Sequence, residues 1–216
     1  ERIYPDEVKQ AKERAGWTLE AFIKELNKSL PDNAKIVLKL KDDLMNNIIE
    51  GGHYLLLSHL REIEKLWFND RPPHWKSTIL AHLRSFAVSI ESIGQEWFGQ
   101  NKFGNILEYA FKKEYINLRD SFGEKIIDAK TPSEYKQKID KIFARKKEGI
   151  CGICGYHLVI AHLTRNYFSH NVKIEANMLG LTFLEVHRSL ILTLISLFIQ
   201  KVKLSGCGRI ILKKDG

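Results

Sequence analysis

The sequence predicts an all-α fold, and two observations lead to that prediction. Apolar residues recur three and four positions apart along most of the chain, as on one face of a helix, while strand-like alternation is scarce. Proline and glycine fall mostly between these periodic segments, where both residues interrupt helices. The one plausible strand is residues 35–41 (KIVLKLK), in which lysine alternates with aliphatic residues. We therefore expect a helical bundle preceded by a small, mostly helical N-terminal region.

The N-terminal region is expected to contain short helices. Residues 5–27 predict two of them, separated at Gly16, and Thr18 is a suitable N-cap for the second. Helical spacing resumes over residues 42–68 and is interrupted at residues 51–52, which are both glycine.

The clearest internal break is Arg71, which stands directly before two prolines. Because a residue that precedes proline is kept out of the helical region, we place a domain boundary here. It divides an N-terminal region, residues 1–70, from a larger helical bundle, residues 71–216. After the boundary, the apolar spacing predicts helices at residues 75–98, 105–120, 131–147, 152–170 and 178–203. The third begins with the capping pair Thr131 and Glu134.

Composition and charge favour a soluble protein with a polyanionic partner. The 216 residues carry a formal net charge of +8, which suits binding to nucleic acid. The longest apolar stretch, Ser189–Ile199, has about half of the roughly 20 residues needed to cross a bilayer. Residues 1–12 are too charged for a secretory signal. We therefore expect a cytoplasmic protein.

Cysteine usage gives little sign of a metal or of a disulfide scaffold. Cys151 and Cys154 form a CxxC pair, but a zinc site would need two more ligands, and a second CxxC or HxxxH pair is missing. Cys207 and a histidine remain candidates for those two positions. An odd, small number of cysteines argues against a secreted, disulfide-rich protein. We expect reduced thiols and no metal.

One helix face within residues 155–170 carries the main functional argument. Its polar members stand three and four positions apart and together cover roughly 140° of the helix circumference. They are His162, Arg165, Asn166, Ser169 and His170. Most exposed helix faces are rich in Lys and Glu, whereas this one carries two histidines, an arginine, an asparagine and a serine.

These side chains suit the cleavage of a phosphodiester. Histidine gives and takes protons near neutrality, because its ordinary pKa is about 6.5. Arginine offers a planar fork of donors that matches phosphate oxygens. Asn166, four residues before His170, can orient the imidazole, and the set suffices for attack by a neighbouring 2′-hydroxyl without metal or cofactor. A solvated or helix-capping role for each residue explains the pattern equally well.

Residues 165–170 (RNYFSH) resemble the Arg-x(4–6)-His signature of HEPN ribonucleases, in its Arg-Asn-x-x-x-His form. The context is similar as well, because an apolar helix leads into the motif and a long hydrophobic helix follows it. The resemblance covers roughly residues 75–204, of which the six-residue motif is the specific part. It implies a helical bundle that forms a homodimer, with the motifs of the two copies facing each other across a cleft.

The resemblance also implies roles for individual residues. Arg165 would hold the scissile phosphate, His170 would act as general acid or base, and Asn166 would order the site. The products would be a 2′,3′-cyclic phosphate and a 5′-hydroxyl. Family members often carry an acidic residue on an earlier helix, and Glu91 matches it, although a plain surface role explains Glu91 as well. The residues that we expect to be accessory are Glu91, His162, Ser169 and Tyr167.

The N-terminal region shows a second, partial resemblance. Residues 11–26 and 44–67 resemble the ends of a helix-turn-helix of the Cro-repressor type. Residues 28–43 interrupt the place where a compact turn and a recognition helix should follow. An ordinary helical lid or dimerisation element is therefore the favoured interpretation of this region.

These observations lead us to expect an RNA-cutting enzyme, with a toxin or antiviral defence role implied by the family, and a possible antitoxin or regulatory partner. Two alternatives from other classes stay open. One is a DNA-binding regulator whose C-terminal bundle only dimerises. The other is an inactive module that binds a nucleotide through Arg165 and His170.

Overall fold

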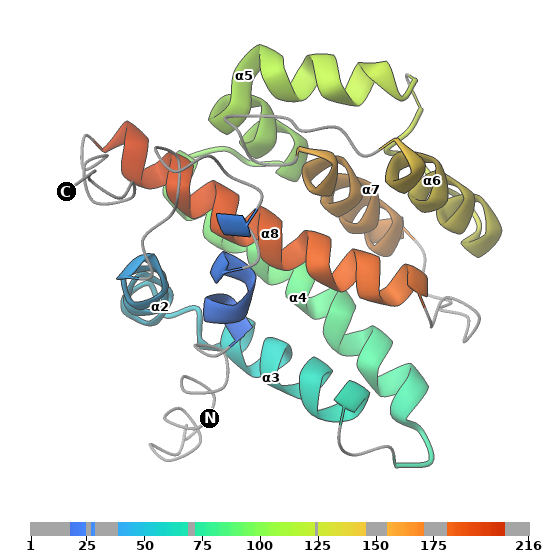
Figure 1. Ribbon diagram of the computed structural model, residues 1–216, viewed down its shortest axis with the longest axis horizontal. Helices are drawn as coiled ribbons and strands as arrows, with labels where there is room; N and C mark the ends of the chain where they lie inside the picture. Colours follow the sequence, from blue (N-terminus) through green and yellow to red (C-terminus); the bar gives the residue numbers. More distant parts are fainter. Residues whose placement is uncertain are drawn as a thin grey trace.

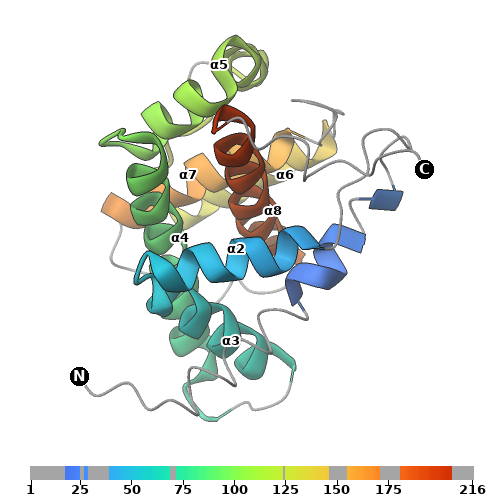
Figure 2. The same ribbon diagram turned by 90° about the vertical axis from the view of Figure 1, so that its left-hand side faces the viewer.

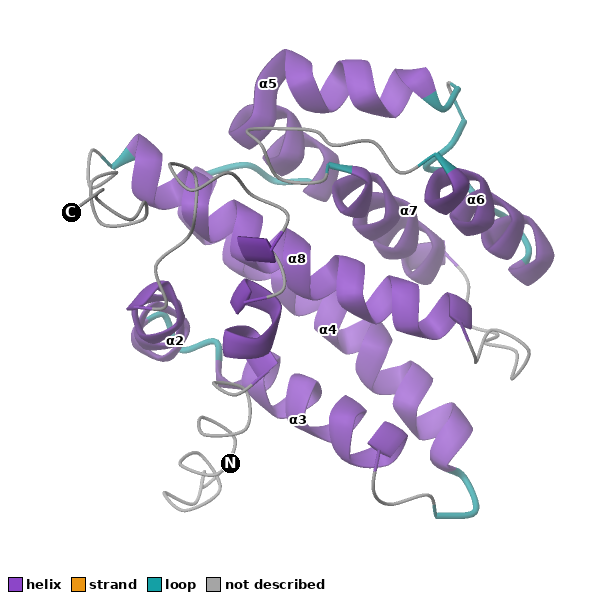
Figure 3. Cartoon of the chain, in the orientation of Figure 1, coloured by secondary structure: helices purple, strands orange, loops and turns teal. Residues whose placement is uncertain are grey.

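The fold is known from a computed structural model that describes residues 18–24, 27–28, 39–68, 72–123, 125–145, 155–170 and 181–205. All regular secondary structure in these ranges is helical (Figure 3). The predicted all-α fold is confirmed.

The predicted helices occur close to their expected positions. The described residues form α2 (Lys39–Glu50), α3 (Tyr54–Phe68), α4 (Trp75–Phe98), α5 (Phe103–Ser121), α6 (Pro132–Ala144), α7 (Tyr156–His170) and α8 (Leu181–Leu204). Residues 18–24, ahead of α2, are helical as well. The break expected at residues 51–52 separates α2 from α3, and Gly52 has the positive φ of 75° that favours glycine.

The strand predicted at residues 35–41 is wrong where the structure describes it. Lys39, Leu40 and Lys41 form the first turn of α2, and residues 35–38 lie outside the described residues. The reason is the helical spacing of Leu40, Leu44 and Ile48, whose side chains are all buried on one face of α2. This longer period outweighs the short alternation of lysine with aliphatic residues.

The helices pack around α8, which runs through the middle of the bundle (Figure 1). α4 and α7 lie against α8, α3 packs on α4, and α6 packs on the outer side of α7. Figure 2 shows the bundle from the side, with α5 at one end and α3 at the other. α5 also changes direction at Lys112, whose backbone is non-helical (φ 51°, ψ −139°).

Every described residue from Ser189 to Gln200 is buried, so α8 is a core helix. By length and composition, Phe183–Leu204 is apolar enough to span a membrane, but 83% of its apolar window is buried among the other helices. The core helix of a globular bundle has the same composition.

The hydrophobic core continues across the predicted domain boundary. Leu60 and Ile63 of α3 belong to the same buried cluster as Leu83 and Phe86 of α4. The division of the chain at residue 71 stays a prediction, and the described helices on its two sides share one core.

α6 begins as the capping pair predicts. The Thr131 hydroxyl accepts the backbone N–H of Glu134 (3.2 Å), and the Glu134 carboxylate accepts the backbone N–H of Lys130 (2.9 Å). Further along α6, Tyr135 stacks on Tyr167 of α7, with ring centroids 4.6 Å apart, and its hydroxyl lies 2.8 Å from that of Thr164. These contacts hold the start of α6 beside the last turns of α7.

Candidate functional site

The predicted polar stripe of α7 does not form one exposed face. From Gly155 to Thr164, every residue of this segment is buried, and solvent is reached only in the last turns. There Arg165 and Asn166 are half-buried and Ser169 is exposed. The chemistry-bearing residues therefore gather at the C-terminal end of a core helix.

Arg165 is held by Glu91 of α4. Its Nε donates to Glu91 Oε2 at 2.5 Å, and its Nη2 contacts the same carboxylate oxygen. The other oxygen, Oε1, accepts the backbone N–H of Phe103, the first residue of α5, at 2.9 Å. One carboxylate thus joins α4, the start of α5 and the end of α7. Its position at a helix N-terminus favours the negative charge.

The third guanidinium nitrogen of Arg165 contacts the hydroxyl of Ser169, one turn later on α7. That hydroxyl in turn donates to the backbone carbonyl of Arg165 at 2.7 Å. The guanidinium is therefore fixed from two sides. The Arg165 side chain keeps 20% of its surface exposed, against 12% for Glu91, so the arginine reaches solvent more than its partner does.

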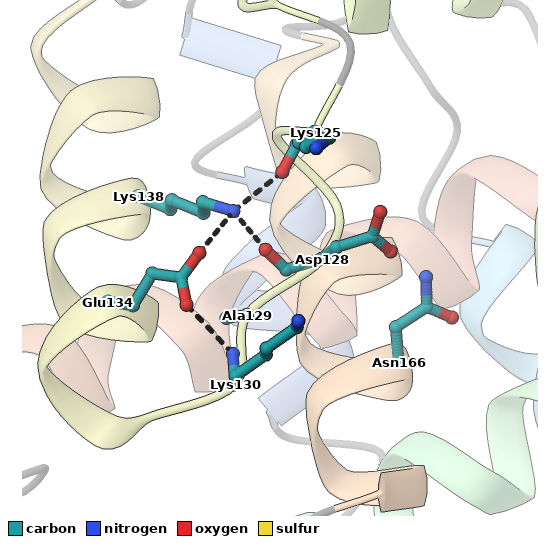
Figure 4. A pocket seen from close by; sticks show the side chains of 7 residues that line it. All are labelled: Lys125, Asp128, Ala129, Lys130, Glu134, Lys138 and Asn166. Atoms are coloured by element: carbon teal, nitrogen blue, oxygen red, sulfur yellow. Dashed lines mark hydrogen bonds and ion pairs between the residues drawn. The ribbon is translucent and has the colours of Figure 1, made fainter.

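Asn166 points away from this ion pair. Its Nδ2 donates to the backbone carbonyl of Ile127, in the segment between α5 and α6, at 3.3 Å. It lines a cavity of about 730 Å³ between that segment, α6 and the end of α7 (Figure 4). The other residues that line the cavity are Lys125, Asp128, Ala129, Lys130, Glu134 and Lys138.

The role expected for Asn166 was to orient the imidazole of His170. α7 ends at His170, but the side chain of this residue lies outside the described part of the chain. What the structure does place is the amide of Asn166, which faces the cavity. Cys151, Cys154 and Cys207 also lie outside the described residues.

His162 is a core residue, which corrects its placement on an exposed stripe. Its side chain is 5% exposed, and Nδ1 lies 2.5 Å from the hydroxyl of Tyr115. Burial, helped by the charge of Arg119, lowers the pKa of His162 to about 4. The imidazole is neutral at physiological pH and is packed edge-on against Phe103.

Tyr167 is likewise structural in its contacts. It is 1% exposed and stacks on Tyr135 of α6, on the opposite side of α7 from the Glu91 pair. Of the residues singled out from the sequence, the structure brings together Glu91, Arg165 and Ser169. It places Asn166 on a neighbouring face and His162 and Tyr167 in the core.

The cavity beside Asn166 was not foreseen in the sequence. Its lysines belong to a chain that carries 34 Lys and Arg residues, and no spacing sets them apart. The one sequence feature that bears on the cavity is the capping pair at Thr131. It fixes where α6 begins, and therefore where the segment before α6 turns.

Comparisons of the chain with protein-family models, with curated proteins and with solved structures gave no match.

Proposed function

We propose that the chain is an endoribonuclease of the HEPN type, which cuts RNA without a metal by attack of the 2′-hydroxyl on the adjacent phosphodiester. The observation that carries the proposal is the ion pair between Arg165 and Glu91. The acidic residue singled out on an earlier helix is the one that holds the arginine of the Arg-Asn-x-x-x-His motif.

An arginine held in this way is prepared for a phosphate. The negative charge of the scissile phosphate grows as a fifth oxygen approaches, and a donor that is already oriented stabilises that charge without reorganising. Glu91 and Ser169 fix the guanidinium, while a fifth of the Arg165 side chain remains open to solvent. Glu91 is a positioning residue in this scheme, because it acts through Arg165.

The reaction needs a base for the 2′-hydroxyl and an acid for the departing 5′-oxygen. The proton leaves the 2′-hydroxyl, its oxygen bonds to phosphorus, and the bond from phosphorus to the 5′-oxygen breaks as that oxygen takes up a proton. We assign His170 to one of these transfers, since imidazole exchanges protons near neutrality. The products are a 2′,3′-cyclic phosphate and a 5′-hydroxyl.

Helix geometry supports a site shared by two copies of the chain. His170 comes five positions after Arg165, so an ideal helix places them roughly 140° apart around its axis and about 7.5 Å apart along it. On an ideal helix, two side chains at this spacing do not converge on one phosphate. A second copy, facing the first across a cleft, can bring its His170 to the phosphate held by Arg165. We propose a homodimer on this basis, and a toxin or defence role by family analogy.

A second candidate function is favoured by the same contacts. All three guanidinium nitrogens of Arg165 already have partners, in Glu91 and Ser169. An arginine so engaged can serve as a structural link between α4 and α7, in a module that dimerises or binds a nucleotide without cutting RNA.

Cleavage of labelled total RNA and tRNA distinguishes the nuclease from the non-cleaving module. The reaction contains excess EDTA and compares wild type with His170→Ala. We expect wild type to cut and the variant to be inactive while it keeps the wild-type circular dichroism. Activity that is lost with EDTA and restored by Mg²⁺ contradicts the proposed chemistry. Inactivity of both proteins favours the non-cleaving module.

A further inference from the structure

We propose that the cavity beside Asn166 holds one nucleotide of single-stranded RNA next to the phosphate bound by Arg165, and that it prefers guanine. The proposal extends the proposed nuclease function by naming where the strand runs and which base it presents. It rests on that function for the location of the scissile phosphate.

The cavity adjoins the Arg165 site through α7 itself. Arg165 and Asn166 are consecutive, so their Cα atoms are about 3.8 Å apart while their side chains point to neighbouring sides of the helix. One leads to the ion pair with Glu91 and the other to the cavity. A strand that lays one phosphate against Arg165 reaches the cavity with its next nucleotide. The volume, about 730 Å³, lies within the range of pockets that hold small organic ligands.

Lys138 and Glu134 tie the floor of the cavity together. The ammonium of Lys138 donates to the carbonyl of Lys125 (2.6 Å) and to that of Asp128, and it pairs with the Glu134 carboxylate at 2.9 Å (Figure 4). Glu134 also accepts the backbone N–H of Lys130. Lys138 thus ties the segment before α6 to α6 itself, and its charge is balanced by Glu134. It is a scaffold rather than a ligand group.

The charges left for a ligand are those of Lys125, Lys130 and Asp128. All three side chains are exposed, and the Lys130 ammonium lies close enough to Glu134 to help lower the pKa of that carboxylate. Two ammonium groups against one carboxylate leave a net positive cavity. A nucleotide within a strand has a phosphate on its 5′ side and another on its 3′ side. Each phosphate can bind one of the two lysines.

Asp128 and Asn166 provide the base-reading surface. Figure 4 shows both side chains on one side of the cavity, with the Asn166 amide nitrogen nearer to Asp128, and Lys130 on the other side. The Asn166 amide donates one N–H to the carbonyl of Ile127, which fixes it beside Asp128. The Asp128 carboxylate is then the acceptor that reads the base. Among the four bases, guanine alone presents two adjacent N–H donors on its Watson–Crick edge, and one carboxylate can accept both. Proteins read unstacked bases of single strands on this edge.

The test uses short RNA oligonucleotides whose 2′-hydroxyls are methylated, so that they bind without being cut. Binding is measured by fluorescence anisotropy over a range of salt concentrations, for oligonucleotides that differ only in one central base. Full-length variants are Lys125→Ala/Lys130→Ala and Asp128→Asn. The control Lys76→Ala/Lys113→Ala removes the same charge from exposed positions on α4 and α5.

Loss of both cavity lysines should weaken binding about tenfold for every base and lower the salt slope of log K by roughly 1.4, the value for two phosphate contacts in a single strand. The control should leave the slope unchanged. Asp128→Asn should remove a roughly tenfold preference for guanine while binding of the other bases stays equal or tightens, because a negative charge is lost.

An unchanged salt slope in the lysine variant, or equal binding of duplex DNA with the same dependence on these lysines, overturns the proposal. So does a preference for guanine that survives Asp128→Asn. Cleavage of unmethylated RNA is measured in parallel. If the variants bind RNA as expected and no RNA is cut, the nuclease proposal is contradicted and the nucleotide pocket is supported. If RNA is cut and the cavity variants bind as wild type does, the nucleotide pocket is contradicted and the nuclease proposal is supported.

Discussion

Glu91 of α4 holds Arg165 of α7 through its Oε2 atom, 2.5 Å from Arg165 Nε, while its Oε1 atom accepts the backbone N–H that opens α5. This carboxylate therefore links three helices and orients the arginine of the motif. The two groups are separated by 74 positions in the sequence, and their meeting depends on the packing of α4 against α7.

Removing the Glu91 charge should affect both stability and catalysis. Glu91→Gln keeps an acceptor for Phe103 but leaves Arg165 without its counter-charge, so we expect about 1–3 kcal/mol of lost stability. The Arg165 guanidinium also loses its orientation, so kcat should fall while the KM for RNA changes little. Urea denaturation and single-turnover cleavage measure the two effects.

A double-mutant cycle provides the control for this prediction. Arg165→Met and Glu91→Gln should couple, with the double variant losing less stability than the two single variants summed. Additive losses together with wild-type cleavage by Glu91→Gln contradict the positioning role of Glu91.

Tyr115→Phe tests whether His162 belongs to the core or to the chemistry. The variant removes the hydroxyl that lies 2.5 Å from His162 Nδ1 and leaves a buried ring nitrogen without that partner. We expect a loss of about 1–2 kcal/mol in the free energy of unfolding and no change in the cleavage rate of the folded protein. A large loss of cleavage with little loss of stability places His162 in the reaction instead.

Buried histidines should make the protein sensitive to acid. Burial lowers the pKa of His162 and of His187 to about 4, whereas both titrate near 6.5 in the unfolded chain. The unfolded chain therefore takes up these protons first. Stability from this source is complete above pH 6.5 and falls as the pH drops from about 6.5 towards 4.

At pH 4, each buried histidine should lower the free energy of unfolding by on the order of 3 kcal/mol, since one pKa unit corresponds to about 1.4 kcal/mol. Urea denaturation across this pH range measures it. His187 packs between Phe183 and Phe86, so His187→Phe is a non-titrating variant that fits the same aromatic surroundings. Its stability should depend less on pH than that of wild type. If the unfolding free energies of the two proteins change equally with pH, His187 is not a source of the acid sensitivity.

Much of the fold could be predicted from the sequence because the ends of a helix depend on residues close by in the chain. Apolar spacing located α4 at residues 75–98, and the capping pair at Thr131 located the start of α6. The strand prediction at residues 35–41 failed where it overlaps α2, because its alternation is short and the spacing of Leu40, Leu44 and Ile48 decides the structure.

The site could be predicted only in part, because burial depends on neighbouring helices. His162 and Arg165 share a face of α7 by spacing, yet one is in the core and the other reaches solvent. α5 packs on α7 beside His162, and Gly104 of α5 allows the close approach. A Cβ at Gly104 would lie 2.8 Å from the His162 ring, so the absence of a side chain there leaves room for the imidazole. No periodicity within α7 carries that information.

Mixing of inactive variants tests the shared site. If Arg165 of one copy acts with His170 of the other, then a heterodimer of Arg165→Ala and His170→Ala contains one intact site. Refolding the two variants together should restore up to a quarter of wild-type activity, because about half of the dimers are mixed and each has one of two sites. Activity that stays at the background level after mixing, with dimers present by light scattering, contradicts a site built from both copies.

The most direct test of the central claim is cleavage of an RNA that carries a single 2′-deoxynucleotide at the mapped cut site, with EDTA present. Attack by the 2′-hydroxyl requires that oxygen, so the modified RNA should remain uncut there, while the unmodified RNA yields a 2′,3′-cyclic phosphate detected by mass spectrometry. Cleavage of the modified RNA at the same bond, or products that carry a 5′-phosphate, would contradict the proposed mechanism.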